Sequence, residues 1–244
     1  MYTQKYNTLN HDADINGILR PTAIQRYMQE TANRQLRDFG PSYEELWQSG
    51  KAFILSRMAV NIYRPIKQYE DIEVATWPCD SDKGVAFNRS YAIYIDGEEV
   101  ARGVGVWALV DIETKKLLRV EEADLSNLEA GPVHSVEGLR FRMPREGMSE
   151  AGQHRVTYNL VDCNMHMNNT NYPDMFYSFI PGVEKYYVKD MSFTYRAEAP
   201  LGAELTVHRS DAAANEDGSL TYYFRSYVGD TVNCEAMITV CPVN

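Results

Sequence analysis

The sequence contains the same order of predicted elements twice, and this internal repeat limits the possible folds more than any other feature. In each half a short strand precedes a helix, and four strands rich in β-branched and aromatic residues follow it. In the first half the strands are expected near residues 3–9, 52–63, 70–77, 85–95 and 99–112. In the second half they are expected near residues 154–161, 184–197, 203–211, 219–228 and 231–241.

Both predicted helices are amphipathic. The first begins at Pro21, a residue suited to a first helical turn, and ends at Gly40-Pro41. Its apolar stripe consists of Ile24, Tyr27, Met28, Ala32, Leu36 and Phe39. The second is expected over residues 170–180 and ends before Pro181-Gly182. Its stripe consists of Tyr172, Met175, Phe176 and Phe179.

Short stretches of matching residues support the repeat. They occur in the same order and on matching elements of the two halves, and insertions in the connections account for their changing offset. The matches are Asp14-Ile15-Asn16 with Asp162-Cys163-Asn164, Tyr63-Arg64 with Tyr195-Arg196, and Arg89-Ser90-Tyr91 with Arg225-Ser226-Tyr227. A duplicated unit explains all three.

A strand, a helix and a run of antiparallel strands can bury the helix only if the sheet wraps around it. Two such units side by side form one continuous antiparallel sheet around two long helices, an α+β architecture called the double hotdog. We therefore predict an N-terminal hotdog at residues 1–118 and a C-terminal hotdog at residues 153–244. Residues 119–152, with charge clusters and Gly131-Pro132 but no clean period, are the expected linker.

The residues that carry chemistry gather before the second helix. Asp162, Asn164, His166 and Asn168 occupy alternate positions, so in an extended backbone their side chains share one face. The cluster is expected at the N-terminus of a buried helix, where unpaired N–H groups favour an oxygen that becomes negative. Asn168 and the following Asn169 are the residue types that cap a helix or form a turn.

The two copies differ at these positions. His166 and Asn168 correspond to Ile18 and Arg20 of the first copy, and Glu198 corresponds to Ile66. The first copy therefore keeps the fold pattern without the histidine and the second acid. We expect one site per chain, formed mainly by the second half.

The chemistry that fits is hydrolysis of an activated acyl group. His166 suits proton transfer at neutral pH, although a structural histidine bonded to a carbonyl is the alternative. Asn164 and a helix-end N–H can polarise a carbonyl. Glu198 can position or deprotonate water, and Asp162 can orient His166 or a backbone donor, or act as a nucleophile. The sequence leaves these roles open.

The segment DCNMHMNNTNY closely resembles the Asp-x-Asn-x-His-x-Asn-Asn-x-x-Tyr signature of the acyl-acyl carrier protein thioesterases of plastids and bacteria. YRAEAP resembles their downstream Tyr-Arg-x-Glu segment, and the resemblance covers nearly the whole chain. It implies the double hotdog, release of a free fatty acid from acyl carrier protein in fatty acid biosynthesis, and catalytic roles for Asp162, Asn164, His166 and Glu198.

The resemblance also implies how the two units divide the work. The first unit would bind the acyl chain and set its length, and Met58 and Trp107 are residues where such control is expected. The cysteine that follows the glutamate in plant members is Ala199 here, so a Cys–His mechanism at that position is impossible. Cys163 is not expected to replace it, because in an extended segment it would point away from Asp162 and Asn164.

Other functions remain open at the level of the sequence. The nearest are an acyl-coenzyme A thioesterase, and a hotdog hydratase or dehydratase that keeps the thiol attached. A non-catalytic acyl-ligand sensor is a third alternative. The intact polar cluster and the absence of a basic DNA-binding segment argue against the sensor.

Composition and charge exclude further partners and cofactors. The net charge of −10 disfavours nucleic-acid binding. No apolar run approaches the roughly 20 residues of a membrane span, and no signal pattern is present, so we expect a soluble, cytoplasmic protein. The four cysteines show no CxxC spacing, and no nucleotide or flavin motif occurs, so we predict reduced thiols, no metal and no cofactor. The oligomeric state is not assigned.

Overall fold

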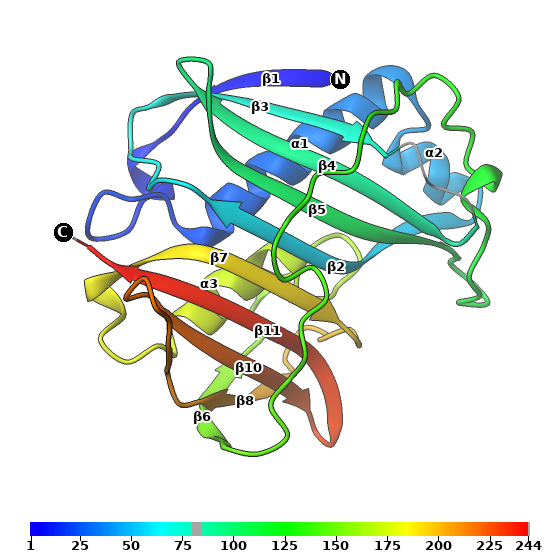
Figure 1. The fold of residues 1–244 in the computed structure, drawn as a ribbon. Coiled ribbons are helices and arrows are strands. Elements are labelled where there is room, and N and C mark those ends of the chain that lie inside the picture. Colours follow the sequence, from blue (N-terminus) through cyan, green and yellow to red (C-terminus); the bar gives the residue numbers. More distant parts are fainter. Residues whose placement is uncertain (80–83, 244) are drawn as a thin grey trace.

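In the computed structural model, which describes residues 1–79 and 84–243, eleven strands form one antiparallel sheet (Figure 1). The first half contributes β1 (Tyr2–Asn7), β2 (Lys51–Ile62), β3 (Asp71–Pro78), β4 (Ala86–Ile95) and β5 (Glu98–Asp111). The second half contributes β6 (Met148–Arg155), β7 (Tyr186–Tyr195), β8 (Glu204–Ser210), β9 (Ala213–Ala214), β10 (Leu220–Val228) and β11 (Thr231–Pro242). Along the sheet the order is β1-β3-β4-β5-β2-β7-β11-β10-β8-β6, with β9 paired to β10.

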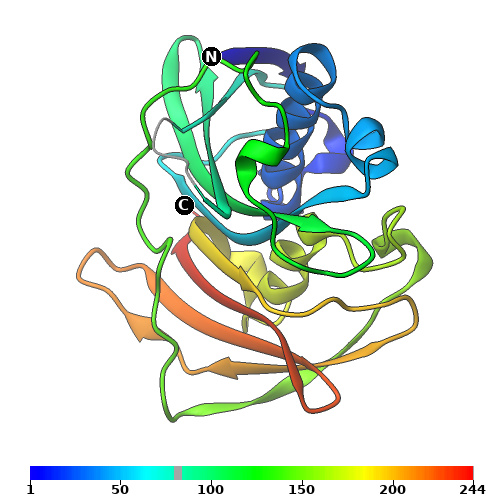
Figure 2. The same cartoon turned by 90° about the vertical axis from the view of Figure 1, so that its right-hand side faces the viewer.

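Three α-helices accompany the sheet: α1 (Pro21–Phe39), α2 (Tyr43–Gln48) and α3 (Tyr172–Tyr177). The first half of the sheet curves around α1 and the second half around α3 (Figure 2). Short 3-10 helices lie at Asn10–Asp12, Val120–Glu122, Tyr158–Leu160, Asn169–Asn171 and Val183–Lys185. The predicted double hotdog is therefore confirmed.

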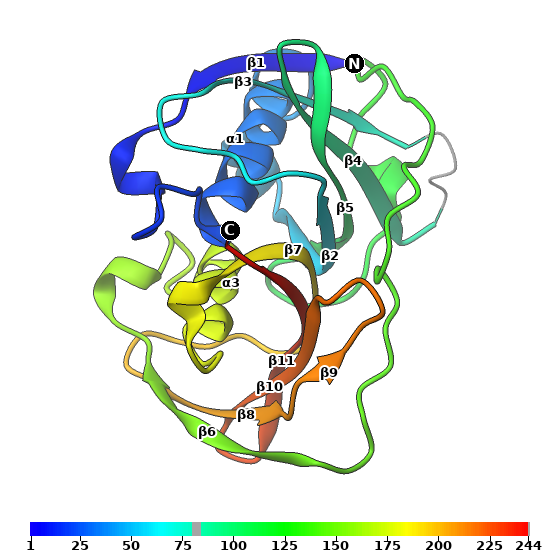
Figure 3. The ribbon, with the colours of Figure 1, turned by 60° about the vertical axis from the view of Figure 1, so that its left-hand side comes forward.

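The two units meet where β2 pairs with β7, and we call this strand pair the seam. Arg57 lies opposite Thr194 at one end of the seam, and Asn61 lies opposite Asp190 at the other. A single hydrophobic cluster includes Met28 beneath the first unit and Phe176 beneath the second. Both central helices therefore lie on the same side of one continuous sheet (Figure 3).

The second helix is shorter than predicted. It spans six residues rather than the expected 170–180, so the prediction of two long helices is wrong for the second unit. The turns after it are closed by hydrogen bonds between residues three positions apart, from Phe179 N–H to Phe176 O and from Ile180 N–H to Tyr177 O. Such tighter turns end an α-helix, and Gly182, with φ at 65°, then redirects the chain.

The apolar stripe of α1 is confirmed only in its first part. Ile24, Met28 and Ala32 are buried, whereas Phe39 is 52% exposed. The buried face also contains the polar side chains Gln25 and Gln35. These glutamines face interior partners that the sequence did not identify.

The segment between the units crosses the outer face of the sheet, opposite the helices (Figure 1). Trp77 Nε1–H donates to Pro132 O at 2.8 Å, and its ring contacts the His134 ring at 4.6 Å. Further along, Glu137 N–H donates to Asn61 Oδ1 at 2.8 Å. The connection is thus an ordered strap over both units.

The strand expected near 154–161 is misplaced, because β6 begins at Met148 and a 3-10 helix follows it at Tyr158–Leu160. Gly152 has φ at 148° and lies at a shift in the register of β6. This irregularity interrupts the alternation of inward- and outward-facing residues by which a strand is recognised in a sequence. The short elements α2 and β9 were not predicted.

The matching segments Arg89-Ser90-Tyr91 and Arg225-Ser226-Tyr227 do not occupy equivalent positions in the two units. Arg89 points inward, since its guanidinium donates to Gln35 Oε1 of α1. Arg225 points outward, because its neighbour Phe224 packs against Phe176 of α3 and adjacent strand residues face opposite sides. The two strands are equivalent, but the matched residues face opposite ways.

Candidate active site

The segment that carries the polar cluster is a tight turn rather than an extended strand. Asp162 N–H donates to His166 O at 3.1 Å, and Met165 N–H donates to Asp162 O at 3.0 Å. Met165 is left-handed, with φ at 63°, which reverses the chain. The expected alternation of side chains across two faces is therefore wrong here.

Asp162 holds this turn together. Its Oδ1 accepts from Asn164 N–H at 2.9 Å, and its Oδ2 accepts from Asn168 Nδ2 at 3.3 Å. Asn168 in turn accepts from Thr170 N–H at 2.9 Å and caps the following 3-10 helix, so its predicted capping role is confirmed. The cap occupies the Thr170 N–H, so this group is not the free helix-end donor expected for a substrate carbonyl.

His166 and Glu198 come together although they are far apart in the sequence. His166 Nε2 lies 3.2 Å from Glu198 Oε2, and their side chains are 31% and 54% exposed. Met167 N–H donates to Ala199 O at 2.8 Å, which ties the turn to the loop after β7. An imidazole paired with a carboxylate at the surface can accept and return a proton.

Asn164 is oriented by a residue of the first unit. Tyr43, at the start of α2, donates its hydroxyl proton to Asn164 Oδ1 at 2.7 Å. Burial raises the pKa of Tyr43 to about 12, so the phenol stays protonated at neutral pH. With its oxygen occupied in this way, the Asn164 amide presents its NH₂ group as a donor.

Tyr43 is the site residue that the sequence analysis missed. The available signal was the capping box Ser42-Tyr43-Glu44-Glu45, in which Ser42 Oγ accepts from Glu45 N–H and Glu45 Oε2 accepts from Ser42 N–H. Six residues are too few for a clear helical period.

Cys163 lies beside this contact, with its Sγ 3.7 Å from the Tyr43 oxygen. It is an exposed, free thiol on the same side as Asn164. The expectation that it points away is wrong because the turn rotates consecutive side chains toward one neighbour. Ala199 is fully buried, in agreement with its lack of a chemical role.

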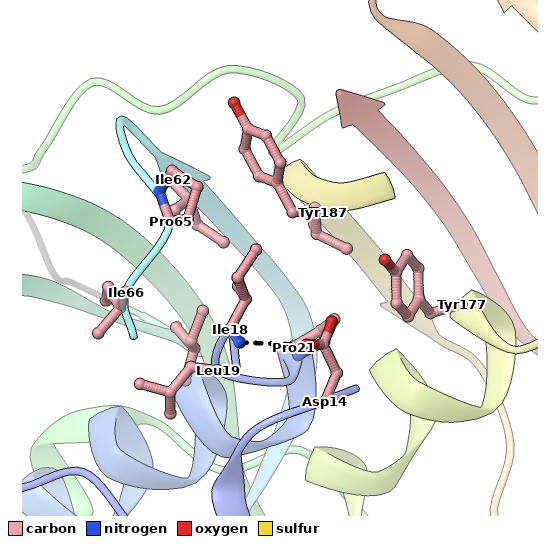
Figure 4. Close-up of a pocket in the computed structure, with 11 residues that line it drawn as sticks. Asp14, Ile18, Leu19, Pro21, Ile62, Pro65, Ile66, Tyr177 and Tyr187 are labelled. Atoms are coloured by element: carbon pink, nitrogen blue, oxygen red, sulfur yellow. Dashed lines mark hydrogen bonds between the residues drawn. The ribbon is translucent and has the colours of Figure 1, made fainter. Parts of the chain in front are cut away.

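The first copy repeats the backbone of the turn without the acid–base pair. Asp14 Oδ1 accepts from Ile18 N–H at 3.1 Å (Figure 4). It also accepts from Asn16 N–H at 2.8 Å, and Gly17 has φ at 71°. Ile18 occupies the position of His166. The pocket around it is lined mostly by apolar side chains, among them Ile66.

Backbone hydrogen bonds show that Glu198 does not correspond to Ile66, contrary to the prediction from the sequence. Leu19 N–H donates to Ile66 O at 2.8 Å, just as Met167 N–H donates to Ala199 O. The counterpart of Ala199 is thus Ile66, and the counterpart of Glu198 is Pro65. The Tyr-Arg match between the halves is accordingly out of register by one residue.

Among the described residues, no group of three or more His, Cys, Asp or Glu side chains is placed to hold a metal ion. In the same residues, no helix has the length and apolar character needed to cross a membrane. The candidate site therefore consists of the His166–Glu198 pair, the Asn164 amide and the residues that hold them.

Known proteins show the same architecture. A bacterial acyl-ACP thioesterase from Bacteroides thetaiotaomicron superposes with a TM-score of 0.84 at 18% identity, covering 98% of this chain and 97% of that one. The 12:0-ACP thioesterase of Umbellularia californica superposes with a TM-score of 0.81 at 15% identity, covering 99% and 94%. At these identities the likeness shows the fold.

The sequence comparisons extend beyond the fold. A chloroplastic acyl-[acyl-carrier-protein] hydrolase of Cuphea viscosissima is 22% identical over 187 residues, covering 70% of this chain. This chain spans only 45% of the length of the Cuphea protein. The family model for the acyl-ACP thioesterase N-terminal domain matches residues 1–127, and the model for the C-terminal domain matches residues 144–239. The chain belongs to the acyl-ACP thioesterase family.

Proposed function

We propose that this protein hydrolyses the thioester of acyl-acyl carrier protein and releases a free fatty acid. The observation that carries the proposal is the contact between His166 Nε2 and Glu198 Oε2 at 3.2 Å. The first copy has the same turn but places Ile18 and Pro65 at these positions, so the acid–base pair is not needed for the fold. A pair present in only one of two matching turns is best explained by chemistry.

In the proposed reaction a water molecule attacks the thioester carbonyl carbon. Glu198 orients the imidazole, and His166 accepts the proton of the water. The Asn164 amide donates to the carbonyl oxygen as it becomes negative. When the intermediate collapses, the C–S bond breaks, and the proton passes from His166 to the leaving thiolate.

We assign Asp162 a positioning role. Both of its carboxylate oxygens accept hydrogen bonds within the turn, from Asn164 N–H and from Asn168 Nδ2. Asp14 makes the same kind of contacts in the copy that lacks the histidine. Tyr43 is a second positioning residue, acting through Asn164.

We also propose the division of labour expected from the sequence. The C-terminal unit at 153–244, extended to the start of β6 at Met148, carries the chemistry, and the N-terminal unit at 1–118 holds the acyl chain. The shared apolar cluster, which contains Met58 on β2, supports this placement. Trp107 on β5 packs against the same cluster.

The carrier protein is the proposed partner, and cytoplasm remains the predicted location. The Cuphea relative is named as chloroplastic. No cofactor enters the proposed reaction.

Steady-state kinetics on one acyl group carried by acyl carrier protein or by coenzyme A test the proposal. We expect fatty acid and free thiol in equal amounts, with a higher kcat/KM for the carrier protein ester. Preference for coenzyme A would point to the acyl-coenzyme A alternative. Conversion without free thiol would point to a hydratase or dehydratase.

A further inference from the structure

A cleft of about 370 Å³ opens on the outer face of the sheet, at one end of the seam. Arg57 of β2 and Thr194 of β7, which are paired across the seam, form its floor together with Arg196 and Glu235. The strap between the units supplies the wall, with side chains from 140–143. The cleft therefore exists only because both units and the strap meet there.

The cleft carries an excess of positive charge. Glu235 is only 8% exposed and is already bound, at 2.6 Å each, by Arg196 and Arg225. Within the described residues, Arg57 and Arg140 form no ion pair and no side-chain hydrogen bond. In a chain with a net charge of −10, this concentration of arginine is a local exception.

The other end of the seam acts as an internal comparison. There the equivalent strand pair is Asn61 with Asp190, and Asn61 Nδ2 donates to Asp190 Oδ1 at 2.8 Å. The strap covers this end, where Glu137 N–H donates to Asn61 Oδ1. Ile62 and Val188, which lie close to this pair in the sequence, line the pocket of the first copy. The acidic, covered end thus belongs to the copy without the histidine.

The arginine-lined end belongs to the copy with the histidine. Arg196 precedes Glu198 by two residues, so their Cα atoms lie no more than about 7 Å apart. A partner held in the cleft is therefore close to the His166–Glu198 pair. Phe141 and Met143 of the strap add apolar surface to the same cleft.

We propose that this cleft docks an acidic surface of the acyl carrier protein and so presents the thioester to His166 and Glu198. This inference rests on the proposed function. An acidic partner is repelled by the rest of a chain of this charge, so a local arginine cleft beside the site decides where it binds. The unpaired state of Arg57 and Arg140 leaves their guanidinium groups available for carboxylates.

The test is the double variant Arg57→Ala/Arg140→Ala, because neither side chain supports another residue. The same acyl group is supplied on acyl carrier protein, on coenzyme A and on pantetheine. We expect kcat/KM for the carrier ester to fall about tenfold, mainly through KM. The values for the two small thioesters should stay within about twofold of wild type.

The matched control is Lys5→Ala/Lys67→Ala. It removes two positive charges from exposed positions of the first unit, and kcat/KM for the carrier ester should change less than twofold. Higher ionic strength should lower the wild-type rate on the carrier ester more than that of the arginine double variant.

An unchanged rate of the arginine double variant on the carrier ester would overturn the docking proposal. So would an equal fall for the coenzyme A ester, which would assign the cleft to phosphate groups, or for the pantetheine ester, which would indicate a damaged site. Failure of the proposed function is a different result, since wild type itself would then not hydrolyse the carrier ester.

Discussion

His166 and Asp162 come from one turn, and comparison with the matching turn of the first copy distinguishes their roles. The aspartate recurs as Asp14 and makes the same local hydrogen bonds, whereas the histidine is replaced by Ile18. We propose that the residue retained in both copies serves the backbone of the turn, and that the residue present in only one copy serves the reaction. The first copy is therefore an internal comparison for the candidate site.

Substitution of the two aspartates, one at a time, separates the contribution of each turn to stability from its contribution to catalysis. Asp162→Ala and Asp14→Ala should each lower stability by about 1 kcal/mol, because each removes hydrogen bonds that close a turn. Only Asp162→Ala should also reduce kcat strongly, since the orientation of Asn164 and His166 depends on that turn. Urea unfolding and steady-state kinetics check the two effects.

The nucleophile alternative has its own test in ¹⁸O-labelled water. In a single turnover with excess wild-type enzyme, we expect the label in the released fatty acid and none in the protein. Label in the Asp162 carboxylate would show that an acyl-carboxylate intermediate forms there.

At the scale of elements, the short helix α2 links the first unit to the site. Its N-terminal Tyr43 reaches across to Asn164, while Tyr43 and Trp47 stack with ring centroids 6.1 Å apart. The helix that sequence periodicity misses is therefore the one that orients the amide.

Tyr43→Phe removes this hydrogen bond while keeping the ring. We expect kcat to fall about three- to tenfold, because the Asn164 amide is no longer fixed with its NH₂ group toward the substrate. KM and the thermal midpoint should change little. Tyr158→Phe is the control, since Tyr158 is 82% exposed. A rise in KM with unchanged kcat would mean that Tyr43 binds substrate instead.

The strap makes stability depend on pH through His134. Burial lowers the pKa of His134, and its Nδ1 is buried without a hydrogen-bond partner among the described residues. The unfolded chain therefore binds this proton more readily than the folded chain. Stability is complete above the ordinary histidine pKa of about 6.5 and is lost as the pH falls below it.

Urea unfolding at about pH 7.5 and about pH 5.5 measures this loss. His134→Gln, which cannot be protonated, should lose less stability between these conditions than wild type. An equal loss in both proteins would show that other groups control the acid sensitivity.

For the whole molecule, the repeat of elements allowed the fold to be predicted, because helix and strand periodicities repeat in the same order. The bounds of α1 and of most strands followed from local signals such as Pro21 and Asp96-Gly97. The expectation that Glu198 lies near His166 came from the resemblance of YRAEAP and DCNMHMNNTNY to the family segments. The sequence did not predict the strap over the seam, the contact of Tyr43 with Asn164, or the residue of the first copy that corresponds to Glu198. These features depend on tertiary contacts and on strand register.

The proposed acyl-chain site in the first unit can be tested with two equivalent methionines. Met58 lies opposite Phe193 across the seam, and Met191 of the second unit lies opposite Val60, both buried. Met58→Ala should shift the preferred acyl chain to greater length, with discrimination changing on the order of tenfold for two methylene groups. Met191→Ala should cost comparable stability without that shift. Equal effects on preference would contradict a chain site confined to the first unit.

The most direct test of the central claim is the rate of fatty acid release from acyl-acyl carrier protein by His166→Ala beside wild type. We expect wild type to turn over and the variant to lose at least about 100-fold in kcat, with a thermal midpoint within a few degrees of wild type. A variant that keeps its rate, or that loses activity only because it unfolds, would contradict a reaction carried by the His166–Glu198 pair.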